Sequence, residues 1–456
     1  MANGQEAMAN GRGRIAGLLR VRQTCGKLDL ITQAVTVIQH LPNARPRFNG
    51  KGHILMKRIP EPARRLRKWL VAPTLLLAVL AMSGCQSLCY YGQAIKGQYG
   101  IVAHQQRIEK LLGDPLTAPP LRAKLELVQS LRAFAEKDLK LPVDGHYQRY
   151  VDLHRPFVVW NVEAAPEFSL EPKGWWYPFV GSLEYRGYFS ERDARNYAAR
   201  MQKKGYDVYV GGVTAYSTLG WFKDPVLNTF VFDPEPDLAE TIFHELGHQR
   251  VFASGDTDFN EAFATTVGQE GARRWLRAKG DRAALEKYLA ELQRTRQFAQ
   301  LLKRTRNRLE TLYGDTRTDE GKLKAARTPR ALPPDQLRRE KQDLIARLQR
   351  EYAQLKSQWG GDTEYDEWFA YPVNNAQLNS VAAYYDLVPG FERLLQQNGG
   401  DLGKFYEAAD KLAREPKTER DNWLRMLGST AGGVGRDRSA GREHASLPGE
   451  IGWASR

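Results

Sequence analysis

The segment FHELGHQRVFASGDTDFNEAFA, residues 243–264, determines how the rest of the chain is interpreted. It contains His244, Glu245 and His248 in the order HExxH, so its two histidines are four positions apart. On a helix, positions four apart share one face, and both imidazoles can therefore reach a single ion. Zinc binds neutral imidazole and keeps one coordination position open for water in catalytic sites. Glu245 then has the position of a general base that removes a proton from that water.

A third ligand is expected on the following helix. Glu261 comes after His248 with twelve residues between them, in the segment FNEAFA, and its carboxylate would complete a set of two histidines and one glutamate. Asp256, Asp258 and Glu270 are the alternative acidic ligands in the same region. We predict a Zn²⁺ site in which Glu261 joins the two histidines of the motif.

The remainder of the chain predicts an α+β fold that is mostly helical. Residues 155–189 are rich in aromatic and β-branched residues separated by Gly and Pro, which is typical of short strands. Residues 281–358 are highly charged, have helical periodicity and are interrupted near Pro333, so they predict a long helical hairpin inserted into the domain. We expect one domain over residues 85–428, with a small mixed sheet beside the helix of the motif.

The N-terminal part combines a basic cluster with an apolar run. A basic cluster at 57–68 precedes the apolar run WLVAPTLLLAVLAMSG, which ends directly before Cys85. A basic region, an apolar region and small residues before a cleavage point are the features of a secretory signal, and the run is short for a membrane-spanning helix. The sequence MSGC at 82–85 resembles a lipobox, in which the cysteine is acylated. We expect residues 56–84 to be a signal peptide and Cys85 to carry the lipid.

Translation is expected to start at Met56, which leaves residues 1–55 as a gene-model extension or a disordered segment. An uncleaved N-terminal anchor is the alternative to acylation, and both place the body of the protein in the bacterial cell envelope, facing the periplasm. The residue after the lipobox cysteine is Gln86 and not an aspartate, which favours the outer membrane over the inner one. Residues 429–456 are rich in Gly, Ser and Arg without periodicity and predict a disordered tail.

The positive net charge does not indicate nucleic-acid binding. Residues 1–84 carry fourteen Lys and Arg against three Asp and Glu, so they account for +11 of the net charge of +14. The body of the chain is close to neutral and would gain little affinity for a polyanion through counterion release. We therefore expect a peptide and a membrane, and no nucleic acid, as partners; the oligomeric state is left open.

The combination of motifs resembles the gluzincin metallopeptidases, which are thermolysin-like enzymes and zinc aminopeptidases. HELGH followed by NEAFATTVGQE carries this resemblance. Together with the lipobox, GGVTAYSTLGWFKDPVLN and NNAQLNSVAAYYDLVPGFE, it is similar to a family of bacterial lipoproteins described as zinc-dependent aminopeptidases, over most of residues 85–427. The resemblance implies a zincin-like fold and aminopeptidase activity. The spacing between the second histidine and the glutamate is shorter here than in the large gluzincin families, so the connecting loop must be tighter.

Further site residues are predicted with alternatives left open. Zinc peptidases stabilise the oxyanion with a donor from elsewhere in the chain, and Tyr384 and Tyr385 are the candidates, with a role as core aromatics equally open. Residues 211–222 are the candidate edge strand against which an extended peptide would pair. Asp224 and Glu240 are conceivable contacts for a substrate amine. The alternative function is a catalytically inactive zincin-like lipoprotein that acts as a binding or scaffold module.

Overall fold

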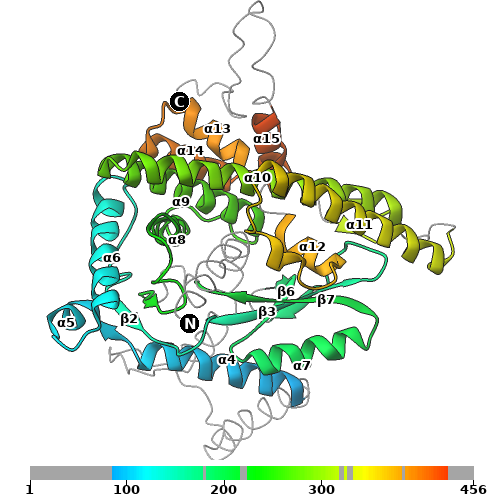
Figure 1. Ribbon diagram of the computed structural model, residues 1–456, viewed down its shortest axis with the longest axis horizontal. Helices are drawn as coiled ribbons and strands as arrows, with labels where there is room; N and C mark the ends of the chain where they lie inside the picture. The colour runs from blue at the N-terminus through cyan, green and yellow to red at the C-terminus, as the bar shows by residue number, and fades with distance from the viewer. Residues whose placement is uncertain are drawn as a thin grey trace, which may run out of the picture.

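The computed structural model describes residues 85–177, 181–215, 223–317, 323–325, 332–382 and 386–429. Most of these residues are helical, and Figure 1 shows long helices arranged around a small twisted sheet. The helices are α4 (Cys85–Ala103), α5 (Ile108–Gly113), α6 (Pro119–Lys137), α7 (Glu191–Gln202), α8 (Glu235–Gly247), α9 (Thr257–Lys279), α10 (Arg282–Tyr313), α11 (Pro334–Gln358), the 3₁₀ helix η2 (Asp366–Phe369), α12 (Asn375–Ala382), α13 (Val388–Gln397), α14 (Leu402–Ala413) and α15 (Lys417–Ser429).

The strands are short and form several small sheets. They are β1 (Gln106–Arg107), β2 (Arg149–Val151), β3 (Val159–Pro166), β4 (Trp175–Tyr177), β5 (Gly181–Leu183), β6 (Tyr185–Tyr188), β7 (Tyr206–Val213), β8 (Val226–Leu227), β9 (Thr316–Arg317) and β10 (Leu323–Lys324). The sheet beside the motif helix is antiparallel, with the order β6-β3-β7 and Asn161 of β3 opposite Gly187 and Gly211. A second sheet of order β1-β2-β8 pairs β2 with β8 in parallel, which makes that sheet mixed.

Helices cover both faces of the antiparallel sheet. Side chains of α4 and α7 form one apolar cluster with β3, β4 and β6, around Trp160 and Val162. The helical hairpin of α10 and α11 forms another cluster with η2 and α12, around Phe298 and Tyr365, whose rings stack 4.2 Å apart. In Figure 1, α12 lies on one side of the sheet and α7 on the other.

The largest core surrounds the motif helix. It is built by α6, α8, α9 and the C-terminal helices α13 to α15, and it includes Phe243, Phe263 and Phe391. The predicted fold is confirmed: the chain is mostly helical, with small mixed and antiparallel sheets and a long helical hairpin. Residues 1–84 and 430–456 lie outside the described residues, so the predicted extension, signal peptide, tail and domain limits stay predictions.

Candidate metal centre

The two histidines of the motif lie at the buried C-terminal end of α8. This helix begins after Pro234, which has no amide hydrogen to leave unpaired at a helix start, and Pro236 follows in the first turn. His244 and Glu245 are in the last turn, and His248 caps the helix with its amide donating to the carbonyl oxygen of His244. The Nε2 atoms of the two imidazoles are 3.1 Å apart, and both rings are buried. The four-residue spacing therefore places both imidazole nitrogens on one side of the helix, as predicted.

A short ordered loop brings Glu261 back to the histidines. The loop ends at Asp256, whose side chain accepts a hydrogen bond from the amide of Phe259 and caps α9. The side chain of Asn260 accepts a hydrogen bond from the amide of Ala253 (2.7 Å) and donates one to its carbonyl (2.8 Å), which closes the loop from inside. This closure is the tight connection that the short spacing requires. Glu261 then enters one turn into α9, fully buried.

The donor atoms of the three residues converge on one point. His244 Nε2 is 3.4 Å from Glu261 Oε2, and His248 Nε2 is 3.7 Å from Glu261 Oε1. Ligands at 2.0–2.2 Å from a tetrahedral zinc ion are about 3.3–3.6 Å from one another, so the observed separations of 3.1 to 3.7 Å fit such an ion. Among the described residues, these three form the group whose ligand atoms all lie within 4.8 Å of one another. The residues present therefore fit a metal ion.

The protonation states also suit a metal ligand set. Burial lowers the pKa of His244 to about 3. Burial likewise lowers the pKa of His248 to about 3, although the carboxylate of Glu261 acts in the opposite direction. Both imidazoles are therefore neutral at pH 7, the form that binds zinc without first losing a proton.

The alternative acidic ligands are engaged elsewhere. Asp256 is buried and bound by Arg420, whose Nη2 lies 2.6 Å from Asp256 Oδ2. Glu270 pairs with two arginines of its own helix. Asp258 is half-buried in the first turn of α9 and pairs with Lys417, whose Nζ lies 3.8 Å from Asp258 Oδ2. Glu261 is thus the carboxylate that lies with the two histidines.

The comparison with known families agrees with this geometry. Residues 89–424 match the family described as "Putative aminopeptidase". The chain belongs to this aminopeptidase family. The match spans well over half of the chain and includes the whole buried group, so the prediction of a metallopeptidase is confirmed at the level of family and site geometry. No curated protein and no solved structure shows significant similarity to the chain.

Glycines set the distance between the two helices of the site. A Cβ atom built on Gly268 of α9 would lie 2.8 Å from the carbonyl oxygen of Glu240 and 3.1 Å from the Cβ of His244. Gly271, one turn later, lies directly under the ring of Phe243, with 2.6 Å from its added Cβ to the ring. Because α8 and α9 can approach this closely only where a side chain is missing, glycine is needed at positions 268 and 271 to bring Glu261 to the histidines.

A buried histidine and tyrosine that contact Asp224 were not predicted from the sequence. Tyr147 is buried in a left-handed conformation (φ 55°), and its amide donates to the carbonyl of Asp224. Burial raises the pKa of Tyr147 well above its usual value, and the negative charges of Glu245 and Asp224 raise it further. His146 is fully buried, and its Nδ1 lies 3.2 Å from the side-chain nitrogen Nε2 of Gln249. His146 and Tyr147 are far upstream of the motif, and no local pattern marks them.

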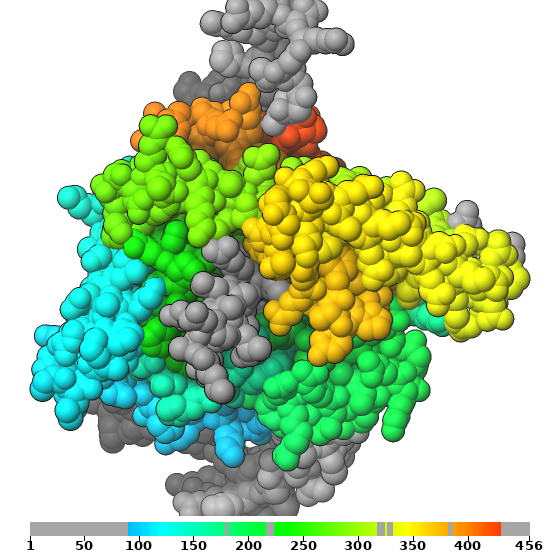
Figure 2. All heavy atoms as spheres, viewed as in Figure 1, coloured from blue at the N-terminus to red at the C-terminus, as the bar shows by residue number. Residues whose placement is uncertain are grey.

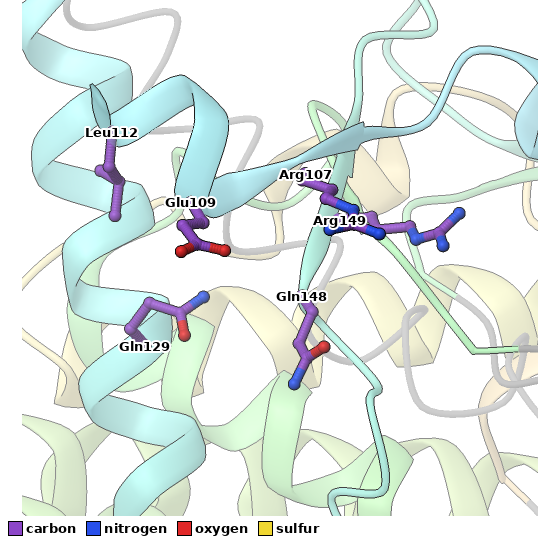
Figure 3. A pocket seen from close by; sticks show the side chains of 6 residues that line it. All are labelled: Arg107, Glu109, Leu112, Gln129, Gln148 and Arg149. Carbon is purple, nitrogen blue, oxygen red and sulfur yellow. The ribbon is translucent and has the colours of Figure 1, made fainter. Parts of the chain in front are cut away.

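A separate pocket lies next to Gln148 and Arg149, which directly follow His146 and Tyr147 in the sequence. It has a volume of about 530 Å³ and lies between α5, α6 and the β1–β2 ladder, and Figure 3 shows six of its lining side chains: Arg107, Glu109, Leu112, Gln129, Gln148 and Arg149. In this view Leu112, Glu109 and Gln129 lie on one side, and Arg107, Gln148 and Arg149 lie on the other. None of the three residues of the metal group lines this pocket, so it is distinct from the candidate metal centre.

Several predicted site residues lie outside the part of the chain that the structure describes. Tyr384 and Tyr385 are outside the described residues, as are residues 216–222 of the candidate edge strand. The first part of that segment forms the end of β7, an edge strand of the sheet β6-β3-β7. Cys85 begins α4, with its side chain outside the description. Glu240 is partly buried one turn before His244 and accepts a hydrogen bond from the hydroxyl of Tyr288 (2.6 Å).

Proposed function

We propose that the protein is a membrane-anchored zinc aminopeptidase that hydrolyses peptide bonds with Glu245 as the general base. The convergence of His244, His248 and Glu261, with Glu245 in the same buried helical turn, is the observation that carries this proposal. Two imidazoles and one carboxylate are a catalytic zinc ligand set, and they leave a coordination position for water. Membership of an aminopeptidase family supplies the class of substrate, a peptide with a free amino terminus.

The residues have distinct parts in this reaction. When bound, Zn²⁺ lowers the pKa of a water molecule towards neutrality. Glu245 accepts the proton of that water and delivers it to the amine that leaves. Tyrosine hydroxyls donate to the carbonyl oxygen of the substrate as negative charge develops on it. Tyr384 and Tyr385 are the tyrosines predicted for this part.

The peptide is expected to pair with the edge of the sheet. Among the described residues β7 pairs with a strand on one side only, with β3, and residues 216–222 follow it in the sequence. Extended peptides add to such an edge through main-chain hydrogen bonds. We propose this edge, with the segment that follows it, as the substrate strand of the enzyme.

Anchoring to the membrane is proposed through Cys85. The support is the basic cluster, apolar run and lipobox-like sequence that directly precede it. Within the described residues, no helix combines the length and hydrophobicity needed to cross a bilayer. An acylated Cys85 would place the enzyme in the bacterial cell envelope, facing the periplasm.

The test is peptide cleavage by matched variants. Wild type, Glu245→Gln and Glu126→Gln, an exposed glutamate of α6 as control, are loaded with zinc and incubated with aminoacyl-coumarin substrates and their N-acetylated forms. We expect Glu245→Gln to bind zinc but to lose at least about a hundredfold in kcat, Glu126→Gln to be unchanged, and acetylated substrates to be resistant. Equal cleavage by wild type and Glu245→Gln would overturn the assignment of the base. Zinc binding without cleavage by wild type would favour the inactive binding module.

A further inference from the structure

The first helix of the described chain has two apolar faces. Tyr90, Ala94 and Ile101 of α4 are buried against the sheet and the body of the protein. Their ring contacts include Tyr90 with Tyr188 at 5.4 Å. This face accounts for the docking of the helix, and it needs no further partner.

The opposite face of α4 is apolar and exposed. Ile95, Tyr99 and Val102 are 47%, 71% and 41% exposed. They are spaced at four and three residues, so they form one stripe along the helix. Exposed apolar residues that occur singly are ordinary, but a stripe of three large ones on one helical face indicates a partner. In Figure 2 the blue residues of this region lie at the lower surface of the molecule.

The position and charge of the stripe indicate which partner. α4 starts at Cys85, the residue proposed to carry the lipid, and Ile95 follows ten residues later, about 15 Å along a helix. No Asp or Glu occurs from residue 85 to residue 108, whereas Lys96 and Arg107 are basic. An apolar stripe with a tyrosine and flanking cations suits the interface of a bilayer with anionic phospholipids.

We propose that α4 lies flat on the membrane surface and inserts Ile95, Tyr99 and Val102 into the headgroup region. This proposal rests on the proposed anchoring through Cys85 and adds a second, non-covalent contact to it. The lipid on Cys85 and the adjacent apolar stripe would act as two neighbouring membrane contacts. The stripe also fixes the orientation of the enzyme on the membrane, with α12 on the far side of the antiparallel sheet (Figure 1).

Photocrosslinking to lipid tests this contact directly. A benzoylphenylalanine probe replaces Tyr99 in the full chain, which is expressed in bacteria and recovered in its membrane vesicles. The matched control replaces Tyr371, which is 77% exposed and lies between η2 and α12. We expect at least tenfold more phospholipid adduct at position 99 than at position 371. Probes at Ile95 and Val102 are expected to label lipid as position 99 does, because they share its face.

Each other outcome overturns the proposal. Equal labelling at positions 99 and 371, or no phospholipid adduct at position 99, shows that the stripe does not touch the bilayer. A protein adduct at position 99 in place of lipid shows that another polypeptide covers the stripe. Peptide cleavage measured on the same vesicles keeps this result separate from the proposed function, because loss of the lipid contact leaves the metal site intact.

Discussion

Replacing Gly268 with alanine tests how the two ligand-bearing helices are held together. The added Cβ would lie 2.8 Å from the carbonyl oxygen of Glu240 and 3.1 Å from the Cβ of His244. Ordinary contacts of a Cβ begin near 3.4 Å, so α8 and α9 must separate by about 0.6 Å at this point. A backbone carbonyl cannot rotate out of the way as a side chain could. The displacement therefore reaches the histidine that faces Glu261.

The magnitude follows from two opposing effects. Overpacking a buried contact costs about 1–3 kcal/mol, whereas alanine in place of glycine favours a helix by about 0.5–1 kcal/mol. Gly92 of α4 has no atom within 4 Å of an added Cβ, so Gly92→Ala keeps the gain without the clash. We expect the unfolding free energy of Gly268→Ala to fall about 1–3 kcal/mol below that of Gly92→Ala. A displaced ligand is also expected to weaken zinc binding about tenfold or more.

Urea denaturation of the metal-free variants measures the first effect. Competition with a chromophoric chelator measures the second, with Gly92→Ala as the control for both. Equal stability and equal zinc affinity of Gly268→Ala and Gly92→Ala would show that the close approach of α8 and α9 does not determine the ligand geometry.

Three further predictions concern buried groups around the site. Burial raises the pKa of Glu240 from 4.5 to about 7, so the folded chain holds that proton more tightly than the unfolded chain. The resulting stabilisation amounts to about 3 kcal/mol. It is complete below pH 4.5 and is lost as the pH rises through 7. Urea titrations at pH 5 and pH 8 should therefore show Glu240→Gln gaining stability relative to wild type at the higher pH, and a constant difference would contradict this. Asn260→Ala leaves both main-chain groups of Ala253 without their side-chain partner and should lower the unfolding free energy by about 2–4 kcal/mol in the same assay. Zinc at a thousandfold excess over its Kd stabilises the folded chain by about 4 kcal/mol, so removing it with a chelator should lower the Tm of wild type. The Tm of His248→Ala should stay unchanged, and equal shifts in both proteins would place the metal elsewhere.

The metal site was predictable because its signal is local. The four-residue spacing of the histidines fixes their common face on any helix, and Glu261 lies within one short loop of them. The helical hairpin was likewise readable from periodicity. In contrast, His146 and Tyr147 meet Asp224 and Gln249 only in the folded chain, and their sequence surroundings carry no pattern of their own. The function of Gly268 as a contact point was also hidden, because a glycine within a helix gives no indication of which backbone it meets.

X-ray absorption at the zinc edge of the purified full chain measures whether His244, His248 and Glu261 hold zinc. We expect one zinc ion per chain with nitrogen and oxygen ligands at about 2.0–2.2 Å, a scattering pattern of two imidazoles, and loss of the ion in His244→Ala. A chain that binds no zinc, a zinc ion with sulfur ligands, or an unchanged spectrum in His244→Ala would contradict this assignment.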